Sequence, residues 1–349
     1  ILIHNKNKKL KTTAPYAFVK TMRAGIIVLG SLLTKFGKAK VSLPGGCAIG
    51  TRPVDIHLLG LKKLGAKIKI NNGYILAEAK KGLIGNKITF PSISVGATEN
   101  VIIAASLAKG TTYLKNCACE PEIKNLTDFL KKMGIKISWI KKREIKIIGN
   151  KNLKRIKHNI MFDRIEAGTF IIAGALAGKG LRITGLESKI LKKELNILKR
   201  MGVRFKIKKN EIKVLETKNI KPTSIKTEPY PGFPTDLQAQ IMVLMTKARG
   251  KSKIKENIFE NRFMHVPELN RMGAKIKILG NTSTVIGSQS LNGAEVMATD
   301  LRASVSLVLA GLIAKDKTII NRVYHLDRGY EKLEKKLRKC KAHISRIHY

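Results

Sequence analysis

A short phrase that returns about every 70 residues most constrains how this chain can fold. It consists of leucine, two polar or basic residues, an apolar residue and glycine, followed by an alternation of apolar and basic residues. The leucines of successive copies lie 69, 68, 71 and 68 residues apart. The copies occupy residues 61–68, 130–137, 198–205 and 269–276, with a worn fifth copy at 337–344. This regularity indicates one structural unit copied along the chain.

Each part of the phrase predicts a local structure. Its basic residues suit the negative end of a helix dipole, and its glycine is typical of the left-handed residue that follows a helix. The alternation that comes next predicts a half-buried strand. A second phrase, at residues 104–113, 173–183 and 309–318, again predicts a helix, a stop of small residues and a strand. We therefore predict an α/β fold in closed domains of several repeats, because the period is too long for a simple solenoid.

A polar, basic stretch at residues 151–158 separates the second copy from the third. We place a domain boundary near residue 160, with a first domain at 1–160 and a second at 161–349. A chain of 349 residues suits two domains that each bury a core. Two repeats then lie in the first domain and three in the second, which suggests that one repeat is missing at the N-terminus.

The charge is unusual, since 68 Lys and Arg against 24 Asp and Glu give a net +44. Such a balance is typical of nucleic-acid-binding proteins. However, the lysines are spread along the whole chain, and aromatic residues, which stack on bases, make up only 5% of it. We therefore expect no nucleic-acid partner and attribute the charge to a biased composition. The sequence has no apolar run long enough for a membrane span, and its four cysteines fit a reducing cytoplasm.

The cysteines differ in their surroundings. Cys47 follows Pro44-Gly-Gly in a glycine-rich loop, and Arg52 lies near enough to favour its thiolate. Cys47 is either a reactive thiol on a mobile loop or a small buried side chain, and the residues alone leave both open. Cys117 and Cys119 have the spacing of neither a zinc site nor a redox pair, so we expect structural thiols. Cys340, assigned to the glycine position of the worn copy, is expected to be structural too. No histidine cluster indicates a metal site.

Acidic residues and arginines recur at the predicted ends of elements. Asp236 follows two prolines and precedes a helix, so it is either an ordinary N-cap or a carboxylate that takes a proton from a substrate hydroxyl. Arg262 lies between two phenylalanines, and Asp300 precedes Arg302 by two residues. Several arginines around one cleft would suit a ligand with phosphate and carboxylate groups.

These segments together resemble the UDP-N-acetylglucosamine 1-carboxyvinyltransferases, the family of enolpyruvyl transferases that begins bacterial peptidoglycan synthesis. The resemblance runs from about residue 14 to residue 346. It implies two domains, each an inside-out α/β barrel of repeats, with an active site between them. Its most specific phrases are at residues 20–24, 42–47, 52–55, 94–98, 233–236, 259–268, 299–303 and 327–330.

The resemblance implies that an enolpyruvyl group passes from phosphoenolpyruvate to the sugar 3′-hydroxyl and that phosphate is released. Cys47 would protonate the methylene carbon of phosphoenolpyruvate, Asp236 would accept the hydroxyl proton, and Asp300 would assist proton transfer. Arg52 and Arg328 would bind phosphate and carboxylate beside Arg302. The residues implied for the nucleotide-sugar pocket are Arg23, Pro53, Val54, Asp55, Ser94, Val95, Gly96, Ile258 and Arg262. No metal or organic cofactor is implied.

The family also carries a Lys-Asn pair near its N-terminus, which binds both substrates, and the sequence lacks that segment. The resemblance therefore implies an N-terminally shortened enzyme with impaired activity. Three alternatives remain open: a sister enzyme that uses shikimate 3-phosphate as acceptor, a nucleotide-sugar-binding remnant without catalysis, and a basic nucleic-acid-binding module.

Overall fold

The computed structural model describes residues 10–20, 22–45 and 54–347, apart from the side chain of Arg23. These residues fold into two compact units, one up to residue 161 and one from residue 162 onward. Each unit has its own hydrophobic core. Within the described ranges, no helix is both long and apolar enough to cross a membrane.

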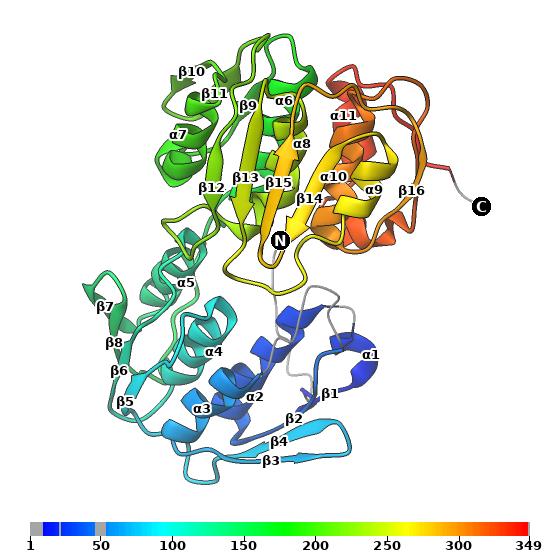
Figure 1. Cartoon of the computed structure of the whole chain (residues 1–349). Coiled ribbons are helices and arrows are strands. Elements are labelled where there is room, and N and C mark those ends of the chain that lie inside the picture. The colour runs from blue at the N-terminus through cyan, green and yellow to red at the C-terminus, as the bar shows by residue number, and fades with distance from the viewer. Residues whose placement is uncertain (1–9, 21, 46–53, 348–349) are drawn as a thin grey trace. The chain divides into compact units, whose positions relative to one another are not determined.

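The first unit alternates helices with strands, coloured blue to teal in Figure 1. Its elements are β1 (Thr13–Ala14), α1 (Tyr16–Val19), the 3-10 helix η1 (Arg23–Ile27), α2 (Val28–Phe36), β2 (Lys38–Ser42), α3 (Asp55–Lys63), β3 (Lys67–Asn71), β4 (Tyr74–Glu78), β5 (Lys87–Thr89), α4 (Val95–Ala105), β6 (Thr111–Lys115), α5 (Pro121–Lys132), β7 (Lys136–Lys141) and β8 (Glu144–Ile148).

The second unit continues the same alternation from green to red (Figure 1). Its elements are α6 (Arg164–Ala177), β9 (Arg182–Thr184), η2 (Ser188–Leu191), α7 (Lys192–Arg200), β10 (Phe205–Lys208), β11 (Glu211–Val214), β12 (Ser224–Lys226), η3 (Thr235–Leu237), α8 (Gln238–Thr246), β13 (Lys251–Lys255), α9 (Val266–Arg271), β14 (Lys275–Leu279), β15 (Thr282–Ile286), β16 (Glu295–Met297), α10 (Leu301–Gly311), β17 (Ile319–Asn321), η4 (Val323–Arg328) and α11 (Leu333–Lys339).

The repeat predicted from the sequence is visible in the sheets. In its full form, a strand, a helix, a second strand, a second helix and a hairpin follow one another, and the last strand of the hairpin pairs with the second strand. The strand orders β1-β2-β4-β3, β5-β6-β8-β7 and β12-β13-β15-β14 show this form. Among the described residues, the other two sheets have the orders β10-β11-β9 and β16-β17. The first two strands pair parallel and the others antiparallel, as in β12, β13 and β15.

The glycine of the repeated phrase ends a helix, as predicted. Gly65, Gly134, Gly202 and Gly273 have φ values of 95°, 103°, 89° and 92°, a left-handed conformation that strains other residues. In the worn copy the equivalent residue is Lys341, with a φ of 67°. The assignment of Cys340 to this position was wrong, because Lys341 is the fifth residue counted from Leu337. Cys340 is exposed, whereas Cys117 and Cys119 are buried as expected.

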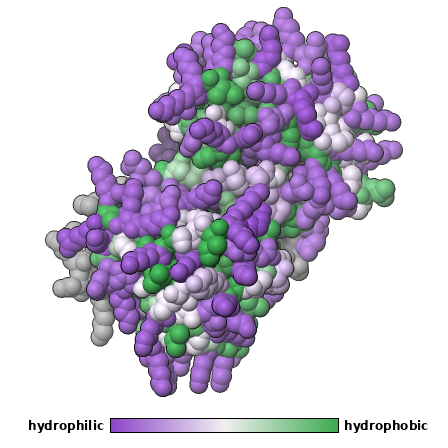
Figure 2. All heavy atoms as spheres, turned by 90° about the vertical axis from the view of Figure 1, so that its left-hand side faces the viewer, coloured by the Kyte–Doolittle hydropathy of each residue, from purple (hydrophilic) through white to green (hydrophobic). Residues whose placement is uncertain are grey.

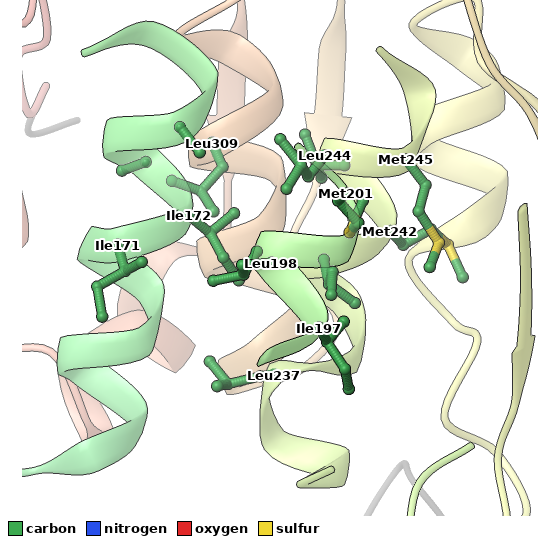
Figure 3. Packing of buried hydrophobic residues seen from close by; sticks show 14 of the residues in the cluster. Ile171, Ile172, Ile197, Leu198, Met201, Leu237, Met242, Leu244, Met245 and Leu309 are labelled. Carbon is green, nitrogen blue, oxygen red and sulfur yellow. The ribbon is translucent and has the colours of Figure 1, made fainter. Parts of the chain in front are cut away.

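Helices fill the interior of the second unit and sheets face the solvent. All nine residues of α8 are buried. Strand β13 alternates exposed lysines with buried residues. Figure 2 shows a largely hydrophilic face of the molecule, drawn purple. The core between the helices is mostly aliphatic and includes several methionines (Figure 3). Its labelled side chains are Ile171, Ile172, Ile197, Leu198, Met201, Leu237, Met242, Leu244, Met245 and Leu309. The structure therefore has the inside-out α/β arrangement expected from the resemblance.

Candidate functional site

In the first unit, the predicted pocket residues gather at the beginnings of helices. Buried Val54 is the N-cap of α3, and exposed Asp55 is its first residue. Ser94 is the N-cap of α4, where its side chain accepts a hydrogen bond from the Ala97 amide at 3.3 Å. Val95 and Gly96 form the first turn of α4.

A third helix of the first unit, α2, runs parallel to α4. The Gly30 amide of α2 donates to Asn100 Oδ1 of α4 at 2.8 Å, and one turn later Thr34 Oγ1 donates to the Ala104 carbonyl at 2.8 Å. Their N-terminal ends therefore point the same way. Arg23, which is predicted to line the nucleotide-sugar pocket, is the first residue of the 3-10 helix that leads into α2. It therefore precedes the N-terminal end of α2 in the chain.

Helix α3 runs in the same direction beside α4. A Cβ placed on Gly96 would lie 3.2 Å from the His57 Cε1 atom, and one placed on Gly60 would collide with Val101. The beginnings of α2, α3 and α4 thus lie at one end of the first unit. The first N–H groups of a helix have no partner within that helix, so the beginnings of α3 and α4 are favourable for an anion such as a diphosphate. The beginning of α2 differs, because the Val28 amide donates to the Gly25 carbonyl of the preceding 3-10 helix.

A buried polar contact that the sequence did not reveal joins these helices. Asn100 uses its Oδ1 atom to accept from Gly30, so its Nδ2 atom donates to the Ile26 carbonyl at 3.2 Å and lies 3.1 Å from His57 Nδ1. His57 Nδ1 is then the acceptor, and the assigned tautomer carries its proton on Nε2, the atom nearer to Gly96. No spacing signal links His57 and Asn100, which are 43 residues apart.

In the second unit, three aspartates lie at the beginnings of three helices. Asp163 caps α6 by accepting from the amides of Ile165 and Glu166 at 2.8 and 3.0 Å. Asp300 caps α10 by accepting from the amides of Arg302 and Ala303 at 2.8 and 3.2 Å. Asp236 lies within η3, ahead of α8, and makes no N-cap hydrogen bond. Of the two interpretations left open for Asp236, the ordinary N-cap is therefore wrong.

The Asp236 carboxylate instead faces arginines. Its Oδ1 atom accepts from Arg262 Nη2 at 2.6 Å and from Arg302 Nε at 3.3 Å. Burial raises the pKa of Asp236, but the nearby guanidiniums of Arg302 and Arg262 outweigh it and hold this pKa well below its usual range. Asp236 is thus ionised at neutral pH, as a general base must be.

A buried hydroxyl group anchors Arg302. The Tyr330 hydroxyl accepts from Arg302 Nη1 at 3.1 Å and lies 2.9 Å from Thr169 Oγ1. Gln240 Nε2 donates to Thr169 Oγ1 at 3.1 Å and to the Asp236 carbonyl at 2.9 Å. This network joins the first turns of α8 and α10 to the second turn of α6. Tyr330 belongs to a specific phrase of the resemblance, but no pattern in the sequence indicated Thr169 or Gln240.

The remaining predicted residues are placed as follows. Ile258 is half-buried in the loop after β13, and Arg328 is exposed at the end of η4. Cys47, Arg52 and Pro53 lie outside the described residues, so their predicted roles stay predictions. Burial raises the pKa of the Cys117 thiol to about 12, which fits a structural cysteine. In the described part of the chain, no group of His, Cys, Asp and Glu residues is placed to hold a metal ion.

The family model of EPSP synthase (3-phosphoshikimate 1-carboxyvinyltransferase) matches residues 2–337. The chain belongs to the EPSP synthase family. Within this family, it is 63% identical over 346 residues to a UDP-N-acetylglucosamine 1-carboxyvinyltransferase of Pelagibacter ubique (strain HTCC1062). That match covers 99% of this chain and 83% of the relative.

Solved structures of this family agree with the fold. The enolpyruvyl transferase NikO from Streptomyces tendae has a TM-score of 0.86 at 26% identity, and the match covers 95% of this chain and 79% of NikO. An EPSP synthase from Acinetobacter baumannii has a TM-score of 0.68 at 17% identity, over 91% of this chain and 77% of that enzyme. The second likeness concerns the fold alone.

Proposed function

We propose that this enzyme transfers the enolpyruvyl group of phosphoenolpyruvate to the 3′-hydroxyl of UDP-N-acetylglucosamine. The bond between C2 of phosphoenolpyruvate and its phosphate oxygen breaks, and a bond from C2 to the sugar oxygen forms. The hydroxyl proton is taken up by a base, and inorganic phosphate leaves. The observation that carries the proposal is the 63% identity to an enzyme of this name over 99% of the chain.

The described residues suit such substrates chemically. The parallel helix beginnings of the first unit, with Val54, Asp55 and Ser94–Gly96, would receive the diphosphate of the nucleotide sugar. Arg23 of the first unit and Ile258 and Arg262 of the second are further candidates for binding the nucleotide sugar. Anions with several charges need fixed cations, and arginine forks match both phosphate and carboxylate groups.

The proposed proton transfers divide between a thiol and a carboxylate. Cys47 would protonate the methylene carbon of phosphoenolpyruvate, which makes C2 electrophilic. The resulting methyl group would lose a proton again as phosphate leaves, which restores the double bond of the enolpyruvyl ether. Asp236 would take the proton of the attacking hydroxyl, and Asp300 would assist. Arg52, Arg302 and Arg328 would hold the phosphate and carboxylate of phosphoenolpyruvate. The negative charge of a phosphate bound to Arg302 would offset the positive charge that lowers the pKa of Asp236. This pKa would then rise toward a value useful to a general base.

In the cell, this reaction would supply peptidoglycan synthesis, and we propose that it takes place in the cytoplasm. The two small-molecule substrates would be its principal partners. The absence of a nucleic-acid partner, expected from the spread of the lysines, stays a prediction.

A phosphate-release assay with both substrates tests the proposal. We expect release that needs phosphoenolpyruvate and UDP-N-acetylglucosamine together, and a rise in melting temperature with the nucleotide sugar. Release with shikimate 3-phosphate in place of the nucleotide sugar would assign the chain to the sister activity. Tight binding of the nucleotide sugar without turnover would identify a remnant. Salt-sensitive binding to random DNA, without stabilisation by nucleotide sugar, would support the nucleic-acid module.

A further inference from the structure

A buried carboxylate to which the resemblance assigns no role, that of Glu256, lies directly after β13. Glu256 is 2% exposed. Its Oε1 atom accepts from Thr227 Oγ1 at 2.8 Å, from the Ile258 amide at 2.8 Å and from the Phe259 amide at 3.2 Å. Its Oε2 atom accepts from Thr235 Oγ1 at 2.9 Å. One side chain therefore bridges the loop after β13 and the segment that begins η3.

Both bridged segments carry candidate site residues. Thr235 directly precedes Asp236, and the loop holds Ile258. The contacts form a closed loop, because Arg262 links the two segments a second time. Its guanidinium lies 5.6 Å from the centroid of the Phe259 aromatic ring and donates to Asp236 at 2.6 Å. The two segments are thus joined twice, once by the Glu256 carboxylate and once by the Asp236–Arg262 ion pair.

Thr227 strengthens the bridge from a third segment. Its buried hydroxyl donates to Glu256 and accepts from the Asn257 amide at 2.9 Å. The Thr227 amide donates to the Lys255 carbonyl at 3.0 Å, next to the Glu256 residue itself. Hydrogen bonds to a buried carboxylate are among the stronger ones in proteins, so this arrangement restricts how the loop can move.

We propose that Glu256 is a positioning residue, which fixes Asp236 and Ile258 relative to each other for the enolpyruvyl transfer. The inference rests on the proposed function. It assigns Glu256 no contact with substrate, so we expect the rate to depend on the length of the bridge more than on the extra strength that the charge gives its hydrogen bonds. Misplacement of a reacting group by about 1 Å can lower a rate by about a hundredfold.

Two variants separate length from charge. E256D keeps the charge but shortens the side chain by one methylene group, so it cannot reach Thr235 and the loop together. E256Q keeps the length, because its amide oxygen can accept from the loop while its NH₂ group donates to Thr235 Oγ1. We expect kcat to fall about 10- to 100-fold in E256D and to stay within about threefold in E256Q.

A matched control guards against a merely structural effect. Ser252, at the other end of β13, is also fully buried, and its side chain accepts from the Thr223 amide at 3.1 Å. S252A removes a comparable bridge away from the site. We expect it to lower the melting temperature as E256D does but to leave kcat within about twofold. T235V should reproduce the loss of E256D, and the double variant should add nothing, because both break the same bridge.

A measurement without substrate keeps the inference separate from the proposed function. The Asp236 carboxyl can be titrated by ¹³C NMR, and the charges that face it belong to Arg164, Arg262 and Arg302. We expect the pKa of Asp236 to rise toward its ordinary value in E256D and to stay low in E256Q and S252A. If the wild-type protein neither turns over nor binds nucleotide sugar, the proposed function fails while this titration still decides the bridge. An unchanged titration in E256D, or equal losses in E256D and E256Q, would overturn the inference.

Discussion

The burial of arginines decides how much two similar ion pairs stabilise the second unit. Asp236 and Arg262 are 2.6 Å apart, with side chains 43% and 4% exposed. Asp327 and Arg346 are also 2.6 Å apart, with side chains 45% and 27% exposed. The carboxylates are thus equally exposed, but D236N strands a buried guanidinium and deprives Arg302, 14% exposed, of its partner.

From these exposures, the two variants should differ in stability. Breaking a fully buried pair destabilises a protein by about 3–5 kcal/mol, which we reduce to about 2 kcal/mol because Asp236 is half-exposed. An exposed pair such as Asp327–Arg346 contributes about 0–1 kcal/mol. We therefore expect D236N to unfold at a lower temperature than D327N by about 2–8 °C.

Differential scanning calorimetry of the wild-type protein, D236N and D327N measures this difference. Inorganic phosphate provides a second readout, since two guanidiniums without a carboxylate fit an oxyanion. Phosphate should raise the melting temperature of D236N more than that of the wild-type protein. Equal stability of D236N and D327N, with no selective effect of phosphate, would refute the reasoning.

Three further outcomes follow from the titrations and hydrogen bonds. Burial, offset in part by Asp300, lowers the pKa of His265 to about 4, so the unfolded chain takes up a proton first and stability falls as the pH drops from about 6.5 to 4. In urea denaturation, the free energy of unfolding should fall over this pH range by up to about 3 kcal/mol more in the wild-type protein than in H265Q. An equal fall in both proteins would contradict this prediction. Burial, with the charges of Glu122 and Glu120, raises the pKa of Glu99 to about 7, so stability is lost as the pH rises from about 4.5 to 7. At pH 8, E99Q should therefore be more stable than the wild-type protein by about 1–3 kcal/mol. An E99Q variant that is less stable than the wild-type protein at that pH would exclude this cause. Y330F removes a buried hydroxyl and should lower the free energy of unfolding by about 1–3 kcal/mol, and an unchanged denaturation midpoint would show that the network adds no stability.

Much of the fold could be predicted because the repeated phrase indicates the same order of helix, turn and strand in each copy. A glycine at a fixed place in four copies predicts four left-handed helix ends, and all four occur, as at Gly65. The alternation after it predicts strands such as β14, which begins two residues after Gly273. The worn copy misled the prediction for Cys340, since a lysine, not a glycine, takes the left-handed position there.

The candidate site could be predicted only in part. Aspartates at helix beginnings were visible, but spacing could not show that Asp300 caps its helix while Asp236 faces arginines. The decisive contacts join residues far apart in the chain, such as Arg302 and Asp236, 66 residues apart, or Tyr330 and Thr169, 161 apart. A local pattern contains no information about such pairs, because they arise only when the helices pack.

The most direct test of the central claim is to identify the product of phosphoenolpyruvate and UDP-N-acetylglucosamine by mass spectrometry and NMR. The account predicts a nucleotide sugar with an enolpyruvyl ether on its 3′ oxygen, formed in equal amount with inorganic phosphate. Phosphate released without this ether, or an ether formed on shikimate 3-phosphate in its place, would contradict it.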